Sequence, residues 1–247
     1  MPSIVGFVAL VVGAYLIGSV PVGYLVARWR RGIDIRQYGT GNVGASNAFR
    51  NVGRWVGVGV AAVNILQSML PTLIALSLGY TRVAAGLVGF AAAIGYAWPL
   101  FLRFSGGRAV ATTGGVIIAL WPIPSILLAL FFIAGAFVKR NPLTMFVGFG
   151  LLPVYLWVSG QPGDEAILAA VLYAFMMSRR LVGLRGDLRG AEHPWLVALN
   201  RLVNDRRPGQ TEYGRHHIGA ADGDGAYFSV GTSNSSDKGA DSRPESK

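Results

Sequence analysis

Seven apolar runs divide the first 180 residues of this chain and constrain its fold more than any other feature. They fall near residues 4–27, 55–79, 83–102, 110–121, 124–138, 143–159 and 164–178. A helix of about 20 apolar residues is long enough to cross the hydrocarbon core of a bilayer. Only 14% of the residues are charged, whereas soluble domains carry about 25%. The sequence therefore predicts an all-α integral membrane protein.

Proline placement bears on how many helices these runs form. Pro122 and Pro124 separate the fourth and fifth runs, which are both short. Two prolines so close together favour a break, although membrane helices tolerate proline. We expect a compact bundle of about seven transmembrane helices with short half-helices, and five or six helices as the alternative. The first run lacks a preceding basic region, so we interpret it as a retained helix rather than a cleaved signal.

Positive charges gather behind alternate apolar runs. Arginine or lysine clusters follow the first, third, fifth and seventh runs. Of the three other turns, the first carries Arg82, the second carries no charge, and the third carries Asp164 and Glu165. The positive-inside rule then places the N-terminus outside, and the arginine-rich loops and the C-terminal tail in the cytoplasm. The net charge of +10 suits anionic lipid headgroups. Nucleic acid is not expected as a partner, because the sequence has no basic stripe interleaved with aromatic residues.

The segment from Gly39 to Arg50 concentrates groups that can hold an anion. Its glycines allow backbone N–H groups to turn toward a phosphate, and its hydroxyl and amide side chains add further donors. The candidates for phosphate contact in this segment are Gly39, Gly41, Asn42, Gly44, Asn47 and Arg50, together with the hydroxyls of Thr40 and Ser46. The alternative is a polar membrane loop that only turns the chain.

A second glycine loop lies at Gly106-Gly107-Arg108. Two glycines can form a nest of N–H groups, and Arg108 adds a permanent cation at the start of a helix, whose N-terminus carries partial positive charge. Charge counting places this loop on the same side of the membrane as the Gly39–Arg50 segment. We therefore expect both loops to contribute to one phosphate site, with a tight turn as the simpler alternative for the second.

Further polar residues flank these loops in the sequence. Ser19 and Tyr24 offer supporting hydroxyls near the end of the first apolar run, and Arg36 can pair with Asp34 to brace the loop. No nucleophile with an adjacent base is visible, and every histidine lies after residue 192. The sequence predicts no metal site, so any chemistry must rest on positioning and electrostatics.

Polar and aromatic side chains also occur inside the apolar runs. Asn64 and Gln67 are three positions apart and share a helix face, which predicts hydrogen bonds between helices. Tyr96 and Trp98 end the third run, where we expect them to be aromatic residues of the membrane interface.

The composition changes after residue 180. Residues 1–180 are expected to form the membrane domain, and residues 181–205 a juxtamembrane segment with a short amphipathic helix or a simple tail. Residues 206–247 are rich in glycine, serine, aspartate and charge, which predicts a disordered cytoplasmic tail.

These motifs resemble the bacterial acyl-phosphate-dependent glycerol-3-phosphate acyltransferases, the PlsY family. The stretch from Gly18 through Arg50 is similar to the family's first signature nearly throughout, and Gly106-Gly107-Arg108 with Val110-Ala111-Thr112 is similar to the second. The resemblance covers roughly residues 4–180 and leaves the tail outside. We therefore expect a divergent member of this family.

The resemblance implies a seven-helix membrane bundle of the bacterial plasma membrane with its site on the cytoplasmic side. It implies transfer of a fatty acyl group from acyl phosphate to the 1-hydroxyl of glycerol 3-phosphate, giving lysophosphatidate and phosphate in phospholipid synthesis, without a cofactor. Enzymes of fatty-acid or phospholipid synthesis are expected as further partners. Thr40, Ser46 and Arg108 would be catalytic. Arg50 would hold a phosphate beside them.

The chain departs from the family at positions that bear on activity. The family usually has lysine, glycine, histidine, aspartate and lysine where this chain has Arg108, Ala109, Tyr96, Asn64 and Gln67. Its final signature, an Arg-His pair and an asparagine, falls where this chain reads Ser178-Arg179-Arg180-Leu181-Val182-Gly183. These departures motivate the alternative of a catalytically impaired paralogue that binds phospholipid or acyl phosphate and regulates a partner. A small anion transporter is a third hypothesis, but no lining of charges along several helices supports it.

Overall fold

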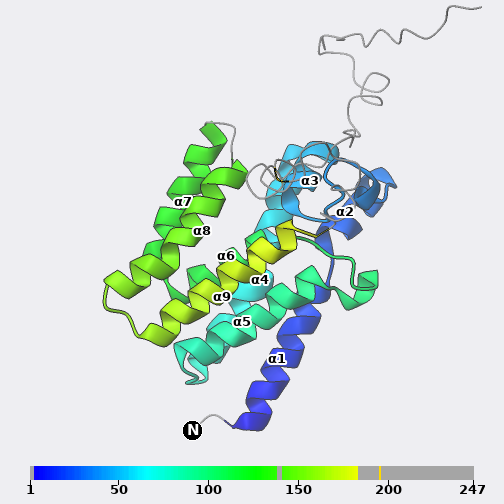
Figure 1. The fold of residues 1–247 in the computed structure, drawn as a ribbon. Helices are drawn as coiled ribbons and strands as arrows, with labels where there is room; N and C mark the ends of the chain where they lie inside the picture. Colours follow the sequence, from blue (N-terminus) through cyan, green and yellow to red (C-terminus); the bar gives the residue numbers. More distant parts are fainter. Residues whose placement is uncertain (1–2, 138–140, 183–194, 196–247) are drawn as a thin grey trace, which may run out of the picture. The chain divides into compact units, whose positions relative to one another are not determined.

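Helices occupy all seven predicted apolar runs in the computed structural model, which describes residues 3–137, 141–182 and Trp195. All of these residues belong to one unit, Met1–Gly214, and the described part of the chain contains no strand. The helices and short 3-10 turns (Figure 1) are α1 Ile4–Ser19, α2 Val22–Arg31, η1 Ile35–Gln37, α3 Ala45–Asn51, α4 Arg54–Ser77, α5 Arg82–Ala97, η2 Leu100–Leu102, α6 Val110–Leu120, α7 Pro122–Phe137, α8 Asn141–Val158 and α9 Gly163–Arg180.

The first apolar run is broken into α1 and α2, which corrects the expectation of one continuous helix. Val20 adopts an extended conformation, and Pro21 lacks the N–H that would continue the helical hydrogen bonds. The buried side-chain amide of Gln67 in α4 donates hydrogen bonds to backbone carbonyls at the break. Its Nε2 donates to the carbonyls of Ile17 at 2.8 Å and of Val20 at 2.9 Å. The predicted contact between helices at Gln67 is therefore confirmed.

The fourth and fifth runs form separate helices, as the two prolines predict. Trp121 leaves the helical region between α6 and α7, with φ −133° and ψ 72°. Pro122 then begins α7. The first N–H groups of a helix have no acceptor within it, so a proline at this position costs no helical hydrogen bond.

Three helical segments are long and apolar enough to cross a membrane. They are Ile4–Arg31, Arg54–Ser77 and Arg82–Leu102, and shorter apolar helices fill Val110–Leu120, Pro122–Gly135 and Leu143–Val158. Large apolar side chains are exposed along α1, α7 and α8, as lipid contact requires. The all-α membrane class is thus confirmed, whereas the number of full crossings stays a prediction.

Small residues let α5 pack closely against its neighbours. A Cβ on Gly18 of α1 would overlap the Ala92 carbonyl of α5, and a Cβ on Gly95 of α5 would overlap the Tyr15 carbonyl of α1. Such close backbone approach is the usual role of glycine between membrane helices. The α5 helix is therefore held rigidly just before the loop that carries Gly106 and Gly107.

The two ends of the bundle differ in chemistry. At one end the Tyr80 hydroxyl donates to the Ser3 carbonyl, and Trp121 donates to the buried carboxylate of Glu165. The opposite end holds the loops after α2 and α5 and the last turn of α9, which ends in Arg179 and Arg180. Residues 183–194 and 196–247 lie outside the described residues, so the juxtamembrane and tail assignments stay predictions.

Candidate functional site

The glycine-rich segment predicted to bind phosphate is half loop and half helix. Residues 32–44, called here the first glycine loop, run from the end of α2 to α3. Gly39 and Gly41 have left-handed φ values of 57° and 66°, which favour glycine. The rest of the segment, Ala45–Asn51, forms α3, a helix that the sequence analysis did not anticipate.

Asn47 organises the first glycine loop from within. Its side chain is 1% exposed, and Nδ2 donates to the carbonyls of Ile35, Tyr38 and Asn42 at 3.0, 3.0 and 2.9 Å. Its Oδ1 accepts from the Thr40 amide at 3.2 Å and from Asn51 at 2.9 Å. Because both polar atoms are engaged inside the protein, the side chain of Asn47 is part of the loop's framework, and its contact with phosphate stays a prediction.

Several backbone N–H groups of the loop are also used internally. The amide of Gly41 donates to the Tyr38 carbonyl at 3.0 Å, and the amide of Gly44 donates to Oδ1 of Asn42 at 3.2 Å. The amide of Thr40 is held by Asn47. Three N–H groups of the predicted glycine cradle are therefore used to shape the loop.

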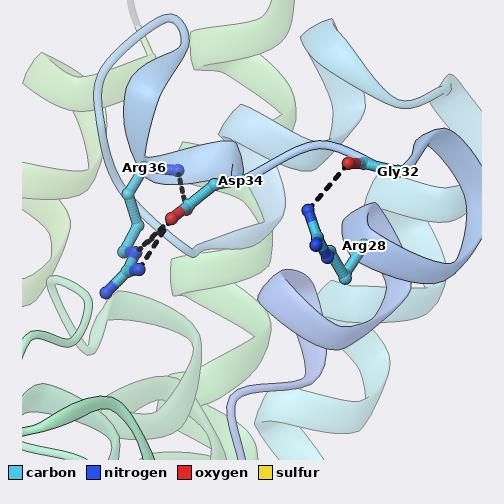
Figure 2. Close-up of polar contacts among 4 residues, drawn as sticks. All are labelled: Arg28, Gly32, Asp34 and Arg36. Carbon is cyan, nitrogen blue, oxygen red and sulfur yellow. Dashed lines mark hydrogen bonds and ion pairs between the residues drawn. The ribbon is translucent and has the colours of Figure 1, made fainter.

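Arg36 and Asp34 form the predicted brace at the start of the first glycine loop. Arg36 donates from Nε to Oδ1 at 2.9 Å and from Nη2 to Oδ2 at 2.6 Å, and Oδ1 also caps η1 by accepting from the Arg36 amide (Figure 2). The guanidinium carbon lies 5.1 Å from the centre of the Tyr24 ring. The hydrogen bonds and charge of Arg36 lower the pKa of the Asp34 carboxyl, and Asp34 in turn raises the pKa of Arg36.

The second glycine loop, residues 103–109, packs directly against Tyr96. A Cβ on Gly107 would overlap the Tyr96 ring, and a Cβ on Gly106 would overlap the Tyr96 carbonyl. The Gly107 amide donates to that carbonyl at 3.2 Å, so it is not part of an open N–H nest. Tyr96 is 5% exposed and accepts from Asn64 at 3.4 Å, which corrects its assignment as an interface aromatic.

Arg179 fastens the last helix to the second glycine loop. From α9 it donates through Nε to the Gly107 carbonyl at 3.3 Å and through Nη2 to the Ala97 carbonyl at 2.8 Å. Its guanidinium carbon also lies 4.4 Å from the centre of the Trp98 ring. The side chain thus joins α9, the end of α5 and the loop into one unit.

Three residues other than glycine have left-handed backbone conformations in this loop. Arg103, Phe104 and Ala109 have φ values of 51°, 61° and 58°. Such conformations cost roughly 1–2 kcal/mol each for residues with a Cβ, so surrounding contacts must hold the loop in place. The contacts made by Tyr96 and Arg179 supply this restraint.

The two loops and α9 meet around a single open cavity of about 560 Å³. Its polar lining comes from the first loop, the second loop and the last turn of α9, and an apolar rim completes it. The lining residues are Asp34, Arg36, Gln37, Gly41, Trp98, Phe104, Ser105, Gly106, Arg179 and Val182. The two loops are thus brought together at one place, as charge counting from the sequence indicates.

The predicted site residues are distributed unevenly around this cavity. Arg36, Gly41 and Gly106 line it, whereas Ser46 and Arg50 are exposed on α3 and do not. Arg108 is partly buried, and its charge acts on the Tyr96 hydroxyl. Gly39 is buried, and a Cβ there would overlap the side chains of Asn47 and Asn51.

Ser19 lies outside this arrangement. Its hydroxyl is buried and donates within α1 to the Tyr15 carbonyl at 2.8 Å. The hydrogen bond of the Ser19 hydroxyl stays within its own helix, and the supporting role of Ser19 stays a prediction.

The sequence analysis did not single out Gln37 and Arg179 as cavity residues. Ser105 adjoins the Gly106-Gly107-Arg108 motif and belongs to the second glycine loop, which the sequence indicated as a phosphate site. Arg179 lies in the stretch that matches the family's final signature, and that match is the signal that could have indicated it. For Gln37 the sequence offers no signal, because a glutamine beside an arginine has no distinctive pattern.

Comparison with known proteins identifies what this arrangement is similar to. The sequence model of the family described as glycerol-3-phosphate acyltransferase matches residues 8–184. Glycerol-3-phosphate acyltransferase 4 of Dehalococcoides mccartyi is 34% identical over 206 residues, covering 81% of this chain and 89% of the relative. The glycerol-3-phosphate acyltransferase of Geotalea daltonii is 41% identical over 188 residues, covering 75% of this chain and 96% of the relative.

Two solved structures have the same fold. Both are crystal structures of PlsY, an integral membrane glycerol 3-phosphate acyltransferase. The glycerol 3-phosphate form superposes with a TM-score of 0.66 at 33% identity, covering 76% of this chain and 94% of the other. The lysophosphatidic acid form gives a TM-score of 0.65 at 32% identity, covering 78% and 98%.

Proposed function

This chain belongs to the glycerol-3-phosphate acyltransferase family, and from this premise we propose that it transfers a fatty acyl group from acyl phosphate to glycerol 3-phosphate at the cavity between its two glycine loops. Acyl transfer to glycerol 3-phosphate by a membrane enzyme is a step of phospholipid synthesis. The single observation that supports this location is the cavity lined by Arg36, Gly106 and Arg179.

The lining of the cavity suits reactants that are polar at one end and apolar at the other. Arg36 and Arg179 bring two guanidinium groups to its wall, and guanidinium is well matched to phosphate oxygens. Trp98, Phe104 and Val182 form an apolar rim, against which an acyl chain can lie. An acyl phosphate combines these two chemistries, which supports it as the donor.

The arginines differ in how much of each is available to a phosphate. Asp34 engages Nε and Nη2 of Arg36, and Nη1 is not part of that clamp (Figure 2). Arg179 is engaged with the carbonyls of Ala97 and Gly107. We therefore assign Arg36 mainly to holding a phosphate, and Arg179 mainly to positioning the second loop. Arg108 and the hydroxyls of Thr40 and Ser46 remain proposed contributors.

The proposed reaction needs no covalent bond to the protein. The 1-hydroxyl oxygen of glycerol 3-phosphate attacks the carbonyl carbon of acyl phosphate, forming the ester C–O bond. The bond between that carbon and the phosphate oxygen breaks, and phosphate leaves with the electron pair and accepts the hydroxyl proton. The protein contributes by orienting both phosphates and stabilising the negative charge that develops.

Membrane orientation follows from the same geometry in this proposal. The cavity lies at the end of the bundle where α2 and α9 finish in arginines, which the positive-inside rule assigns to the cytoplasm. The N-terminus of α1 would then face outward. Water-soluble glycerol 3-phosphate would enter from the cytoplasm, where enzymes of fatty-acid or phospholipid synthesis would deliver the acyl donor.

Phosphate release tests the function and the site together. Purified full-length protein is given acyl phosphate and glycerol 3-phosphate, and wild type is compared with Arg36→Ala and with Arg103→Ala. Losing one charge-assisted contact of about 1.5–3 kcal/mol lowers kcat/KM roughly 10- to 100-fold in Arg36→Ala. Arg103 is exposed and does not line the cavity, so its variant keeps the wild-type rate. No release by the wild type would refute the activity, and equal rates in all three would refute the placement of the site.

A further inference from the structure

Exposed arginines and tryptophans surround the ends of two membrane-spanning segments near the first glycine loop. We define the basic collar as Arg28, Trp29, Arg30, Arg31, Arg54 and Trp55. Trp29 is 80% exposed and Trp55 is 88% exposed, and all four arginines are exposed as well. The proposed acyl transfer uses none of these residues, which leaves the role of so much exposed aromatic and cationic surface to be explained.

The collar comes from two elements that the fold brings together. Arg31, the last residue of α2, donates through Nη2 to the Val52 carbonyl at 3.4 Å, two residues before α4 begins at Arg54. At the other end of α2, a Cβ on Gly23 would contact Val60 of α4. The α2 helix therefore runs antiparallel along the start of α4, beside α3 in Figure 1, and its basic end meets the basic beginning of α4.

Charge at this end of the bundle is strongly one-sided. The described residues contain three carboxylates, at Asp34, Asp164 and Glu165. Asp34 is clamped by Arg36, and the other two begin α9 at the opposite end. Within the described residues, no ion pair joins a collar arginine to a carboxylate, although the charge of Arg28 acts on Asp34. Arg28 donates to the Gly32 carbonyl at 2.9 Å (Figure 2), and Arg30 lies 5.5 Å from the centre of the Trp29 ring.

The depth of the collar indicates which anion it meets. One candidate membrane span ends at Arg31 and another begins at Arg54, so the collar lies where hydrocarbon gives way to headgroups. Tryptophan is enriched at that depth, and arginine near an anionic surface is attracted by about 1 kcal/mol. We infer that the basic collar binds the phosphate groups of anionic phospholipids. An acidic protein partner would not explain why both tryptophans lie at span ends.

Tryptophan quenching by brominated lipid tests this inference. Wild-type protein is reconstituted in mixed vesicles in which either phosphatidylglycerol or phosphatidylcholine carries bromine near the headgroup. The Trp29→Phe/Trp55→Phe variant reports the signal of the other tryptophans, which is subtracted. The ratio of the two quenching curves gives the preference of the collar for the anionic lipid over the zwitterionic one.

Removal of collar charges then supplies the decisive comparison. The preference for phosphatidylglycerol falls about fivefold for each arginine replaced in Arg30→Gln and Arg30→Gln/Arg54→Gln, and it weakens in 1 M salt. Arg103→Gln, an exposed arginine of the second glycine loop, leaves it unchanged. Phosphate release at the wild-type rate verifies that the Arg30 and Arg54 variants are folded. Equal quenching by the two lipids in wild type would overturn the inference, as would an unchanged preference in the double variant.

Discussion

Replacing Arg179 tests whether the last helix positions the second glycine loop. In Arg179→Ala, the carbonyls of Gly107 and Ala97 lose hydrogen bonds of 3.3 and 2.8 Å from a charged donor, and Trp98 loses a cation at 4.4 Å. A hydrogen bond to a charged group contributes about 1.5–3 kcal/mol, and a cation–π contact about 1 kcal/mol. Removing the Arg179 side chain, which lines the cavity, opens space through which water can reach the two buried carbonyls, and this reduces the sum. We expect a net loss of about 2–4 kcal/mol.

That loss is concentrated in the loop, so it affects activity as well as stability. The three left-handed residues of the loop, Arg103, Phe104 and Ala109, favour relaxation once the restraint is removed. A displacement of about 1 Å at a site of this kind costs roughly 100-fold in rate. Because the displaced loop still borders the cavity, kcat falls more than KM rises. Phosphate release measures the two constants, and thermal unfolding in detergent measures stability.

Arg179→Lys is the matched control for charge. Lysine keeps the cation over Trp98, but its single ammonium group lacks the planar fork that reaches Gly107 and Ala97 together. We expect a kcat between those of the alanine variant and the wild type. If Arg179→Ala retained both the wild-type kcat and the wild-type melting temperature, the positioning role would be refuted.

Three further perturbations follow from the structure. Gly107→Ala places a Cβ against the ring of Tyr96 and lowers kcat at least tenfold, which phosphate release measures. Glu165→Ala leaves the indole N–H of buried Trp121 without its acceptor and costs about 1–3 kcal/mol, whereas Glu165→Gln, which keeps an acceptor oxygen, costs less in thermal unfolding. The pKa of Asp34 is lowered in the folded protein. The clamp of Asp34 therefore contributes its full stability at pH values above the ordinary pKa of 3.8, and this stability is lost as the pH falls through the lower pKa of the folded state. The difference in melting temperature between wild type and Asp34→Asn therefore stays constant from about pH 8 to 5 and shrinks only in stronger acid; a steady decline across neutral pH would contradict this.

Local patterns in the sequence are enough to predict the helices and the region of the site. Apolar run length predicts helices in all seven places, and Pro122 marks a real break. Pro21 has the same effect in the first run, where the length of the run favoured a continuous helix over the break. Alternating charge indicates that the two glycine loops share one end of the bundle, and they do line one cavity.

The role of each polar residue depends on its partners, and partners are a property of the tertiary structure. Asn47 and Gly41 have the chemistry of phosphate donors, yet the nitrogen of each donates within the loop. Tyr96 has the composition of an interface aromatic, yet it is buried between the two glycine loops, close to Gly44 and Gly107.

The sequence by itself determined the membrane class, the seven helical runs, the family and the two loops that line the cavity. These follow from run length, charge alternation and residue order, which are local properties of the chain. Only the tertiary structure decided that Arg36 and Arg179 line one cavity with Gly41 and Gly106, and that Arg179 reaches the carbonyl of Gly107, 72 positions away in the chain. The physical reason is that a donor can serve only the acceptors packed around it, and long-range packing chooses those acceptors.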